Sequence, residues 1–417
     1  MRTILPLTFA ALPCLLAAQT TVGDIAATGY SSTRFGIFGG AGPVVAYVTP
    51  GFQGGASQTI LWDDQQPASF LIGGPSFLGR ATILGPGTVQ YTVLTTNVGI
   101  VMQMAWDAQH RLVFADAATA AVHRFDPATG AVTALTNGPQ PWGFDLSALA
   151  RDPLTGDVFV GGSAGVHRLA AGTTTATPIV TGLGSFVADL ALDPSSGDLI
   201  AGLTWSHRVV RITRSGTVTD LVPPQTITSP NALAYDHDNE LLVGSGNGEV
   251  FRLPRSGGAP ISLFVNNSPF GTTSGLAVVG AGGYGLPFGN ACQATFGPAT
   301  LRTDGPFRTG TTMTTTSTGH APSSLGVLVL GTSRTNWGTV PLPLPLDPLL
   351  GTAGCSLLVS GDITLAGLAD AGSPAVLSFA LPLPAGLAGA AWFAQHVALE
   401  AVAGGMSWSN GLAVTIR

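Results

Sequence analysis

Short apolar segments alternate with turns rich in Asp, Gly and Pro through the first two thirds of the chain, and these segments recur with a regular period. One set shares an alanine, with steps of 45, 41, 43 and 43 residues between Ala105, Ala150, Ala191, Ala234 and Ala277. A second set shares an arginine, with steps of 44, 44, 43 and 41 residues between Arg80, Arg124, Arg168, Arg211 and Arg252. Two independent registers with one period indicate a structural repeat.

Each repeat predicts four short strands. An apolar strand is followed by a turn such as DPLTGD, a second apolar strand such as DVFVGG, a glycine-rich hairpin, the arginine strand and a strand rich in Thr and Val. Four strands in about 43 residues are typical of a β-propeller blade.

The two ends of this region are expected to share one blade. Counting back one period places a repeat at Ile60–Asp63, whereas the last repeat, at Leu276–Val279, has a single strand before the pattern stops. We expect the N-terminal segments Arg34–Phe38 and Val44–Val48 to complete it, because a closed ring leaves no strand edge exposed. The count is then six blades, with five and seven as the alternatives.

The pattern changes after Gly280, where the period ends and Thr, Leu and Pro become frequent. Alternating segments such as LGVLVLG, AVLSFAL and WFAQHVALE predict an antiparallel β-sandwich of about eight strands. A chain of 417 residues exceeds the usual size of one hydrophobic core. We therefore expect an all-β protein with two domains, a propeller over residues 19–284 and a sandwich over residues 285–417.

Residues 1–18 are typical of an export signal. Arg2 precedes an apolar stretch from Ile4 to Leu16, and two alanines stand before Gln19, where we expect the mature chain to begin. Pro13 before Cys14 argues against a lipoprotein signal. Later apolar runs are too short to cross a membrane. The protein is therefore expected to be secreted or extracytoplasmic, in the periplasm or at the cell surface.

The cysteines agree with export. Cys292 and Cys355 both lie in the C-terminal third, and one disulfide is the simplest interpretation in an oxidising compartment. A metal site is the alternative, but no His or third Cys stands at ligand spacing.

The charged residues narrow the range of functions. The chain contains no lysine, so Schiff-base chemistry, Ser-Lys dyads and P-loop nucleotide binding are excluded. The net charge of −6 argues against a nucleic-acid partner. We expect the arginines of the repeat to be structural and to pair with aspartates of the turns.

Several motifs resemble functional sites but have simpler interpretations. The run Gly161–Gly165 reads GGSAG, like the nucleophile elbow of serine hydrolases, yet it joins two predicted strands and is expected to be a hairpin turn. The run Asp236–Glu240 resembles the start of a calcium loop, yet an apolar strand follows where glycine is required. His123 and His167 share one position of the repeat and are expected to pack. Packing is also expected of the propeller tryptophans, namely Trp62, Trp106, Trp142 and Trp205.

Two segments of the repeat region resemble a known group of propellers. RLVFADAATAAVHRFDPATGAVTAL at 111–135 resembles a blade of the six-bladed NHL and SMP-30/gluconolactonase group, and SPNALAYD at 229–236 is similar to the PNGL-type motif of the latter. The resemblance covers residues 22–280. LPLPLDPLLGTAGCSLLVS at 341–359 and the end of the chain resemble a C-terminal module of secreted bacterial multidomain proteins.

The SMP-30 resemblance implies a lactonase whose divalent ion is held over the channel by acidic and Asn side chains. Asn231 matches one such position, and the equivalent positions of the other repeats are Gln58, Met102, Ser147, Ala188 and Ser274. Met and Ala offer no oxygen ligand from their side chains. Asp189 lies one residue out of register, which predicts that it points to the other face of its strand.

These observations favour a secreted binding protein without catalytic residues or a cofactor. Its partner is an unidentified protein, glycan or small molecule, and the sandwich is an accessory module. The candidate ligand-binding residues of the channel are Gln58, Ser147, Asp189, Asn231 and Ser274. The alternative is a lactone hydrolase of the SMP-30 kind, with calcium or another divalent ion at Asn231.

Overall fold

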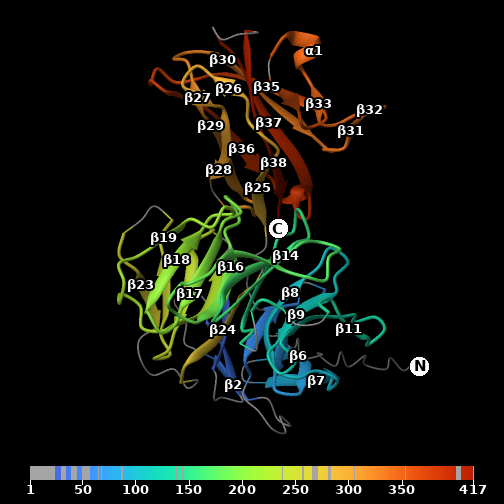
Figure 1. Cartoon of the computed structure of the whole chain (residues 1–417), viewed down its shortest axis with the longest axis vertical. Coiled ribbons are helices and arrows are strands. Elements are labelled where there is room, and N and C mark those ends of the chain that lie inside the picture. Colours follow the sequence, from blue (N-terminus) through green and yellow to red (C-terminus); the bar gives the residue numbers. More distant parts are fainter. Residues whose placement is uncertain are drawn as a thin grey trace, which may run out of the picture.

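The structure is a computed structural model of the chain. It describes residues 24–416 except for 30–33, 39–44, 49–56, 64, 67, 86–87, 138–139, 143–144, 237, 256–257, 265–270, 280–282, 305, 353 and 401–404. The predicted export signal lies outside the described residues. Almost all regular structure is β-strand, arranged in a ring of sheets with a second body standing on one side of it (Figure 1).

Five blades come from consecutive strands of the repeat. The first two are β4 (Thr59–Trp62), β5 (Ser69–Gly74), β6 (Phe77–Gly85) and β7 (Thr88–Thr95), then β8 (Val101–Trp106), β9 (Leu112–Asp116), β10 (Ala121–Phe125) and β11 (Val132–Ala134). The next two are β12 (Ala148–Arg151), β13 (Val158–Gly162), β14 (Gly165–Leu169) and β15 (Thr177–Val180), then β16 (Val187–Leu192), β17 (Leu199–Leu203), β18 (Arg208–Ile212) and β19 (Val218–Asp220). The fifth is β20 (Pro230–Tyr235), β21 (Leu241–Ser245), β22 (Val250–Leu253) and β23 (Ile261–Phe264).

The sixth blade joins the two ends of the ring. In it β24 (Thr273–Val278) pairs with β1 (Ile25–Gly29), which pairs with β2 (Arg34–Phe38), and β3 (Val45–Val48) forms the outer edge. The six-bladed ring and the composite closing blade are confirmed. The prediction included only two of the three N-terminal strands and missed β1, which is the strand that contacts β24.

One aspartate at the end of each complete repeat's inner strand has two tasks. Its Oδ1 accepts the N–H two residues later, which holds the turn, and its Oδ2 pairs with an arginine at 2.7–3.2 Å. The pairs are Asp63 with Arg80, Asp107 with Arg124, Asp152 with Arg214, Asp193 with Arg211, and Asp236 with Arg252. The structural role expected of the arginine register is confirmed, except that Arg168 pairs with Asp157 instead.

The C-terminal body is a sandwich of two sheets. The larger contains β25 (Tyr284–Phe288), β38 (Met406–Thr415), β37 (Ala391–Leu399), β30 (Leu325–Gly331) and β35 (Ile363–Leu368), and the smaller contains β28 (Thr300–Asp304), β29 (Thr311–His320) and β36 (Ala375–Leu383). Between them lies one apolar core that includes Leu301, Leu328, Leu377 and Leu412.

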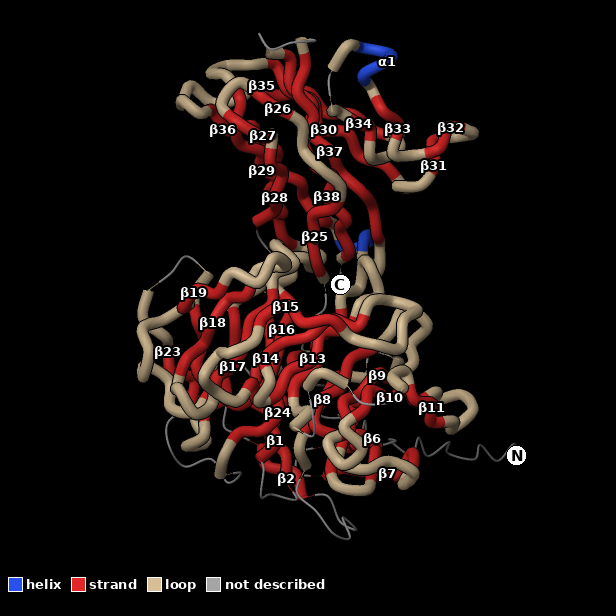
Figure 2. The backbone as a smooth tube through the Cα atoms, in the orientation of Figure 1, coloured by secondary structure: helices blue, strands red, loops and turns tan. Residues whose placement is uncertain are grey.

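Short elements lie along one side of the sandwich and at its end far from the propeller (Figure 2). They are β26 (Gln293–Ala294), β27 (Gly297–Pro298), β31 (Asn336–Trp337), β32 (Val340–Pro341), β33 (Leu344–Pro345), α1 (Asp347–Leu350) and β34 (Ser356–Leu357), while the short 3-10 helix Ala385–Leu387 precedes β37. The predicted disulfide between Cys292 and Cys355 is present and closes a separation of 63 residues. No helix among the described residues is long and apolar enough to span a membrane.

The sandwich contacts the face of the propeller at which the inner strands end (Figure 1). Four polar contacts cross between the two bodies, namely Gly285 N–H to Pro194 O, Arg255 to Thr303 O, Arg334 to Leu154 O, and Arg308 to Asp238. The ion pair between Arg308 and Asp238 is largely exposed and contributes little to stability, and the other three are single hydrogen bonds to backbone oxygens.

We therefore predict that the propeller folds without the sandwich. A chain ending at Gly283 should keep a strand-rich circular dichroism spectrum and a cooperative thermal transition, because all six blades are retained. Loss of that transition, with the full chain as the control, would show that the ring depends on the sandwich and that the predicted boundary is wrong.

Candidate functional site

The inner strands of the six blades surround a central channel. Each contributes the same run of positions, beginning on the side away from the sandwich: residues 58–63, 102–107, 147–152, 188–193, 231–236 and 274–279. Equivalent residues therefore meet as successive tiers along the channel.

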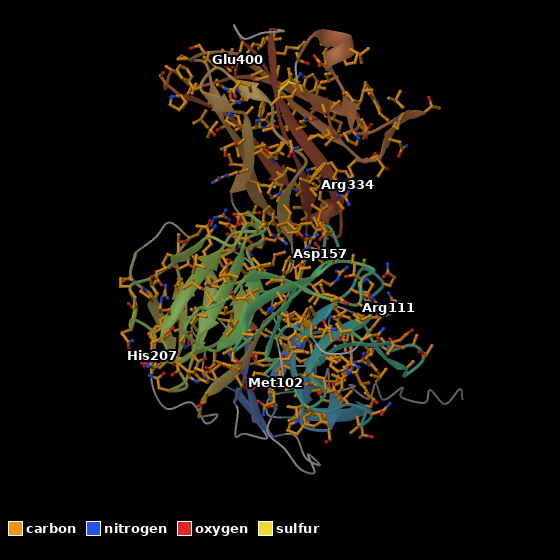
Figure 3. All side chains as sticks on the ribbon, viewed as in Figure 1. Met102, Arg111, Asp157, His207, Arg334 and Glu400 are labelled. Carbon is orange, nitrogen blue, oxygen red and sulfur yellow. A yellow bond between two sulfur atoms is a disulfide. The ribbon has the colours of Figure 1, made fainter. Side chains whose placement is uncertain are left out.

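The first tier lines a cavity of about 330 Å³ at the open end of the channel, which we call the mouth. Its inner-strand residues are Gln58, Met102, Ser147, Ala188, Asn231 and Ser274, and the remaining lining residues are Phe186, Thr204, Trp205 and Thr272. Met102 marks its place on the side of the propeller away from the sandwich (Figure 3). The structure thus brings together four of the five candidate residues predicted for the channel.

Most polar groups of this first tier are already engaged. Ser147 Oγ donates to Val187 O at 2.6 Å, and Ser274 Oγ donates to Ser57 O at 3.1 Å. The Asn231 Oδ1 accepts a hydrogen bond from Thr204 at 2.8 Å. The Oε1 atom of Gln58 differs, because it is buried and no described residue forms a hydrogen bond with it. An unpaired buried carbonyl oxygen is costly unless a ligand or a water satisfies it.

Trp205 stands at the rim of the mouth. Its side chain is 68% exposed, and its ring stacks on Phe186 with centroids 5.5 Å apart. The expectation that it packs between blades is wrong, although Trp142 is buried as predicted. Trp205 lies in the hairpin between β17 and β18, where other blades have SAG and GNG. A large aromatic residue in a turn that otherwise contains small residues was the signal available in the sequence.

Asp189 does not line the mouth but closes the channel beneath it. Its Oδ1 accepts hydrogen bonds from Gln103 Nε2 at 2.6 Å and from Leu190 N–H at 2.7 Å, and its Oδ2 accepts from Leu233 N–H at 2.7 Å. Gln103 Oε1 in turn accepts from Thr59 Oγ1 at 2.7 Å. This network connects four inner strands across the ring, and we call it the plug.

The prediction that Asp189 points to the other face of its strand is therefore wrong. It assumed regular alternation, but Ala188 is an extra residue in a β-bulge between Val187 and Asp189. Similar bulges occur at Met102 and Asn231. Complete burial raises the pKa of Asp189 to about 7, against the effect of its three hydrogen bonds.

The channel residues do not fit a divalent cation. Both carboxylate oxygens of Asp189 accept hydrogen bonds, the Asn231 Oδ1 accepts from Thr204, and Met102 has no oxygen in its side chain. Elsewhere in the described part of the chain, no three His, Cys, Asp or Glu side chains converge as a metal site would require.

The motifs that resembled catalytic sites have structural roles. Gly162 pairs with Gly165 across the tight turn between β13 and β14, and Ser163 donates to Asp145 at 2.6 Å, so GGSAG is a hairpin. The Asp236 Oδ1 accepts two N–H groups of its own turn. His123 stacks on Phe114, and His167 is buried beside Trp142.

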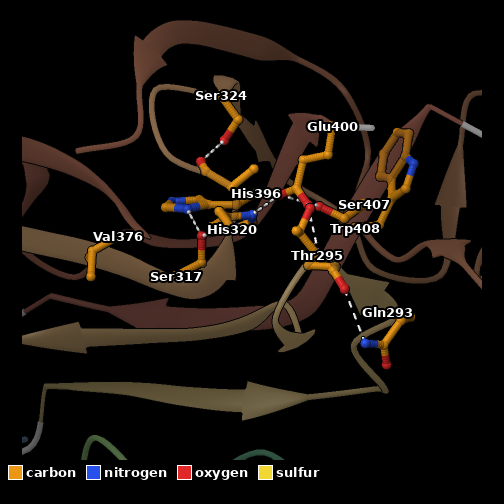
Figure 4. Close-up of polar contacts among 12 residues, drawn as sticks. Gln293, Thr295, Ser317, His320, Ser324, Val376, His396, Glu400, Ser407 and Trp408 are labelled. Carbon is orange, nitrogen blue, oxygen red and sulfur yellow. Dashed lines mark hydrogen bonds and ion pairs between the residues drawn. The ribbon is translucent and has the colours of Figure 1, made fainter. Parts of the chain in front are cut away.

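One polar cluster in the sandwich was missed by the sequence analysis (Figure 4). Ser317 Oγ lies 2.7 Å from His320 Nε2, and His320 Nδ1 lies 2.5 Å from Glu400 Oε1, which is the order of a hydrolase triad. All three are buried, and Ser317 Oγ also lies 2.8 Å from His396 Nδ1. Burial, and to a smaller extent the electrostatic effect of the neighbouring His320, lower the pKa of His396 to about 3. Because Ser317 is buried in the core between the imidazoles of His320 and His396, it has a structural role and is not accessible to a substrate as a nucleophile.

Comparisons with known proteins do not identify a family for this chain. No family model matches the chain, and no curated protein matches its sequence. A chain of a nidogen/laminin complex is similar over 61% of this chain and 98% of its own, with 10% identity and a TM-score of 0.49. A streptogramin B lyase is similar over 51% of this chain and 70% of its own, with 17% identity and a TM-score of 0.39. The virginiamycin B lyase of Staphylococcus aureus is similar over 52% of this chain and 73% of its own, with 17% identity and a TM-score of 0.40.

The plug predicts a pH dependence of stability. The pKa of Asp189 is raised from 3.8 to about 7 on folding, so the folded state binds a proton more tightly than the unfolded state. The propeller should therefore lose stability as the pH rises from about 4 to about 7, by ~4 kcal/mol at most. Asp189→Asn cannot ionise and should lack this decrease, although it removes the acceptor of one N–H at a constant cost of about 1–3 kcal/mol.

Urea unfolding followed by tryptophan fluorescence at pH 4.5 and pH 8 measures this difference. Asp126→Asn is the matched control, because Asp126 only accepts a hydrogen bond within its own turn, and it should keep the dependence of the wild type. An equal pH dependence in wild type and Asp189→Asn would contradict the raised pKa.

Proposed function

We propose that the protein is a secreted, non-catalytic binding protein that holds a neutral glycan at the mouth of its propeller. The single observation that carries this proposal is the exposed ring of Trp205, stacked on Phe186 beside a cavity of about 330 Å³. An exposed indole next to a concave, partly polar site places apolar surface in water, and a ligand that covers the indole removes this surface from water and so gains binding free energy.

The chemistry of the lining favours an uncharged ligand with hydroxyl groups. None of the ten residues around the mouth has an ionisable side chain. The amides of Gln58 and Asn231 can exchange hydrogen bonds with hydroxyls, and the unpaired Gln58 Oε1 requires a donor. A sugar ring supplies hydroxyl donors along its edge and C–H groups on its face, which match the amides and the indole. The volume is at the lower end for small-ligand sites and suits the end of a glycan chain.

The same lining supports a binding role over catalysis. A hydrolase requires a general acid or base within reach of its substrate, and the described residues around the mouth offer neither. Secretion is supported by the export signal expected at residues 1–18 and by the disulfide in the sandwich. The sandwich lies against the opposite face of the propeller, so it leaves the mouth accessible as an accessory or attachment module would.

Replacing Trp205 should remove most of the binding. On an array of neutral oligosaccharides, Trp205→Ala is expected to bind at least about tenfold more weakly than the wild type, because it loses the stacking surface. Trp337→Ala is the matched control, since Trp337 is 46% exposed on the sandwich, and it should bind like the wild type. The proposal fails if the wild type binds no neutral glycan, or if both variants lose binding equally.

Divalent ions should not stabilise the protein. We expect no change in melting temperature when calcium or zinc is added to the wild type or to Asn231→Ala, because the side-chain oxygens of Asp189 and Asn231 already accept hydrogen bonds and the Gln58 amide alone is a poor site for a divalent ion. A rise of several degrees that Asn231→Ala abolishes would contradict this and support the lactonase alternative.

A further inference from the structure

A second, separate cavity lies in the channel between the plug and the sandwich, and we call it the inner chamber. Its volume is about 370 Å³, and all six inner strands line it. The tier next to the plug is entirely aliphatic and buried: Ile60, Met104, Leu149, Leu190, Leu233 and Leu276.

The next tier creates the empty space. Five of its six positions are alanine, with Leu61 as the sixth: Ala105, Ala150, Ala191, Ala234 and Ala277. The short alanine side chains at five of the six positions leave space at this level of the ring, which the longer apolar side chains of the tier next to the plug would occupy. The alanines that reveal the repeat in the sequence are thus the residues that hollow out the chamber.

The third tier turns the chamber into an amphipathic site. Trp62, Trp106 and Tyr235 form partly exposed aromatic walls, and Arg151 stands among them. Tyr284, the first residue of β25, lines the end toward the sandwich. The chamber therefore has an apolar floor and aromatic walls, and its upper end carries Arg151 together with Asn239 and with Asp236, whose carboxylate is paired with Arg252.

Arg151 forms no ion pair within the described part of the chain, although the carboxylates of Asp107 and Asp152 lie near enough to attract it. It is partly buried, and its hydrogen bond is to Trp106 O at 3.3 Å. The two nearest carboxylates are committed to other arginines, Asp107 to Arg111 and Arg124, and Asp152 to Arg214. A half-buried guanidinium in apolar surroundings favours an anionic partner, and a carboxylate matches its planar pair of donors.

We propose that the inner chamber binds a monocarboxylate with an unbranched apolar tail, of the medium-chain fatty acid type. The carboxylate pairs with Arg151, and the tail occupies the alanine tier and ends on the aliphatic tier above the plug. Burial of the tail provides the affinity, and the guanidinium selects the anionic head group. The described residues that line the mouth carry no charged side chain, so the two ends of the channel select chemically different ligands.

Isothermal titration of the full chain with decanoate, below its micellar concentration, tests this proposal. The wild type should bind one decanoate, and should bind decanol and decyltrimethylammonium at least tenfold more weakly. Arg151→Gln should weaken decanoate binding by about tenfold or more. Arg208→Gln is the matched control, because Arg208 pairs with Asp220 on the outer strands and does not line the chamber; its affinity should equal that of the wild type.

Ala234→Leu tests the position of the tail, since a leucine in the alanine tier fills the space and should abolish binding. Circular dichroism verifies that Ala234→Leu is folded. If it is not folded, the effect of Arg151→Gln on decanoate affinity decides whether the chamber is the binding site. The proposal is overturned if the wild type does not bind decanoate, if decanol binds equally well, or if Arg151→Gln has no effect. Trp205→Ala should leave decanoate binding unchanged, which separates this site from the glycan site at the mouth.

Discussion

The antiparallel pairing of β1 with β24 is the contact on which the rest of the structure depends. Ile25 lies opposite Val278 and Ala27 opposite Leu276, so the first described strand of the chain completes the sheet begun by the last strand of the propeller. Without this pairing both strands would be free edges, and the six inner strands would have no fixed common axis. Because the ring is closed, equivalent residues of distant repeats face one another, and the channel acquires defined tiers.

The plug divides this channel into two environments. Asp189 and Gln103 connect two blades that are not neighbours in the ring, and Gln103 extends the network to Thr59 in the blade opposite Asp189, with a bulge at Ala188 next to the carboxylate. On one side lies a mouth lined by amides, hydroxyls and an exposed indole. On the other lies a chamber lined mainly by aliphatic and aromatic side chains, with Arg151, Asp236 and Asn239 at its upper end. Burying an acid at the junction has a cost in stability, which the raised pKa of Asp189 records.

The position of the sandwich gives the two ends of the channel different access. It stands over the ends of the inner strands, and Tyr284 lines the chamber on that side. The mouth faces away from it (Figure 3). The sandwich has its own core, its own disulfide and a buried cluster around Ser317, so its stability comes from contacts within it. One body can therefore present a ligand site while the other is free to contact a surface or a partner.

The sequence alone determined the repeat, the six blades, the composite closing blade, the sandwich and the disulfide, because period, alternation and cysteine count are properties of the chain read in order. It also placed Gln58, Ser147, Asn231 and Ser274 in one tier, because equivalent positions of a closed repeat must meet. Only the tertiary structure decided the roles of Asp189, Trp205 and Arg151. Asp189 lies beside a β-bulge, and Trp205 is exposed in a hairpin. Arg151 forms no ion pair among the described residues, because other arginines pair with the nearby carboxylates. Such outcomes depend on local geometry and on competition between side chains that are far apart in sequence, which a periodic pattern does not encode.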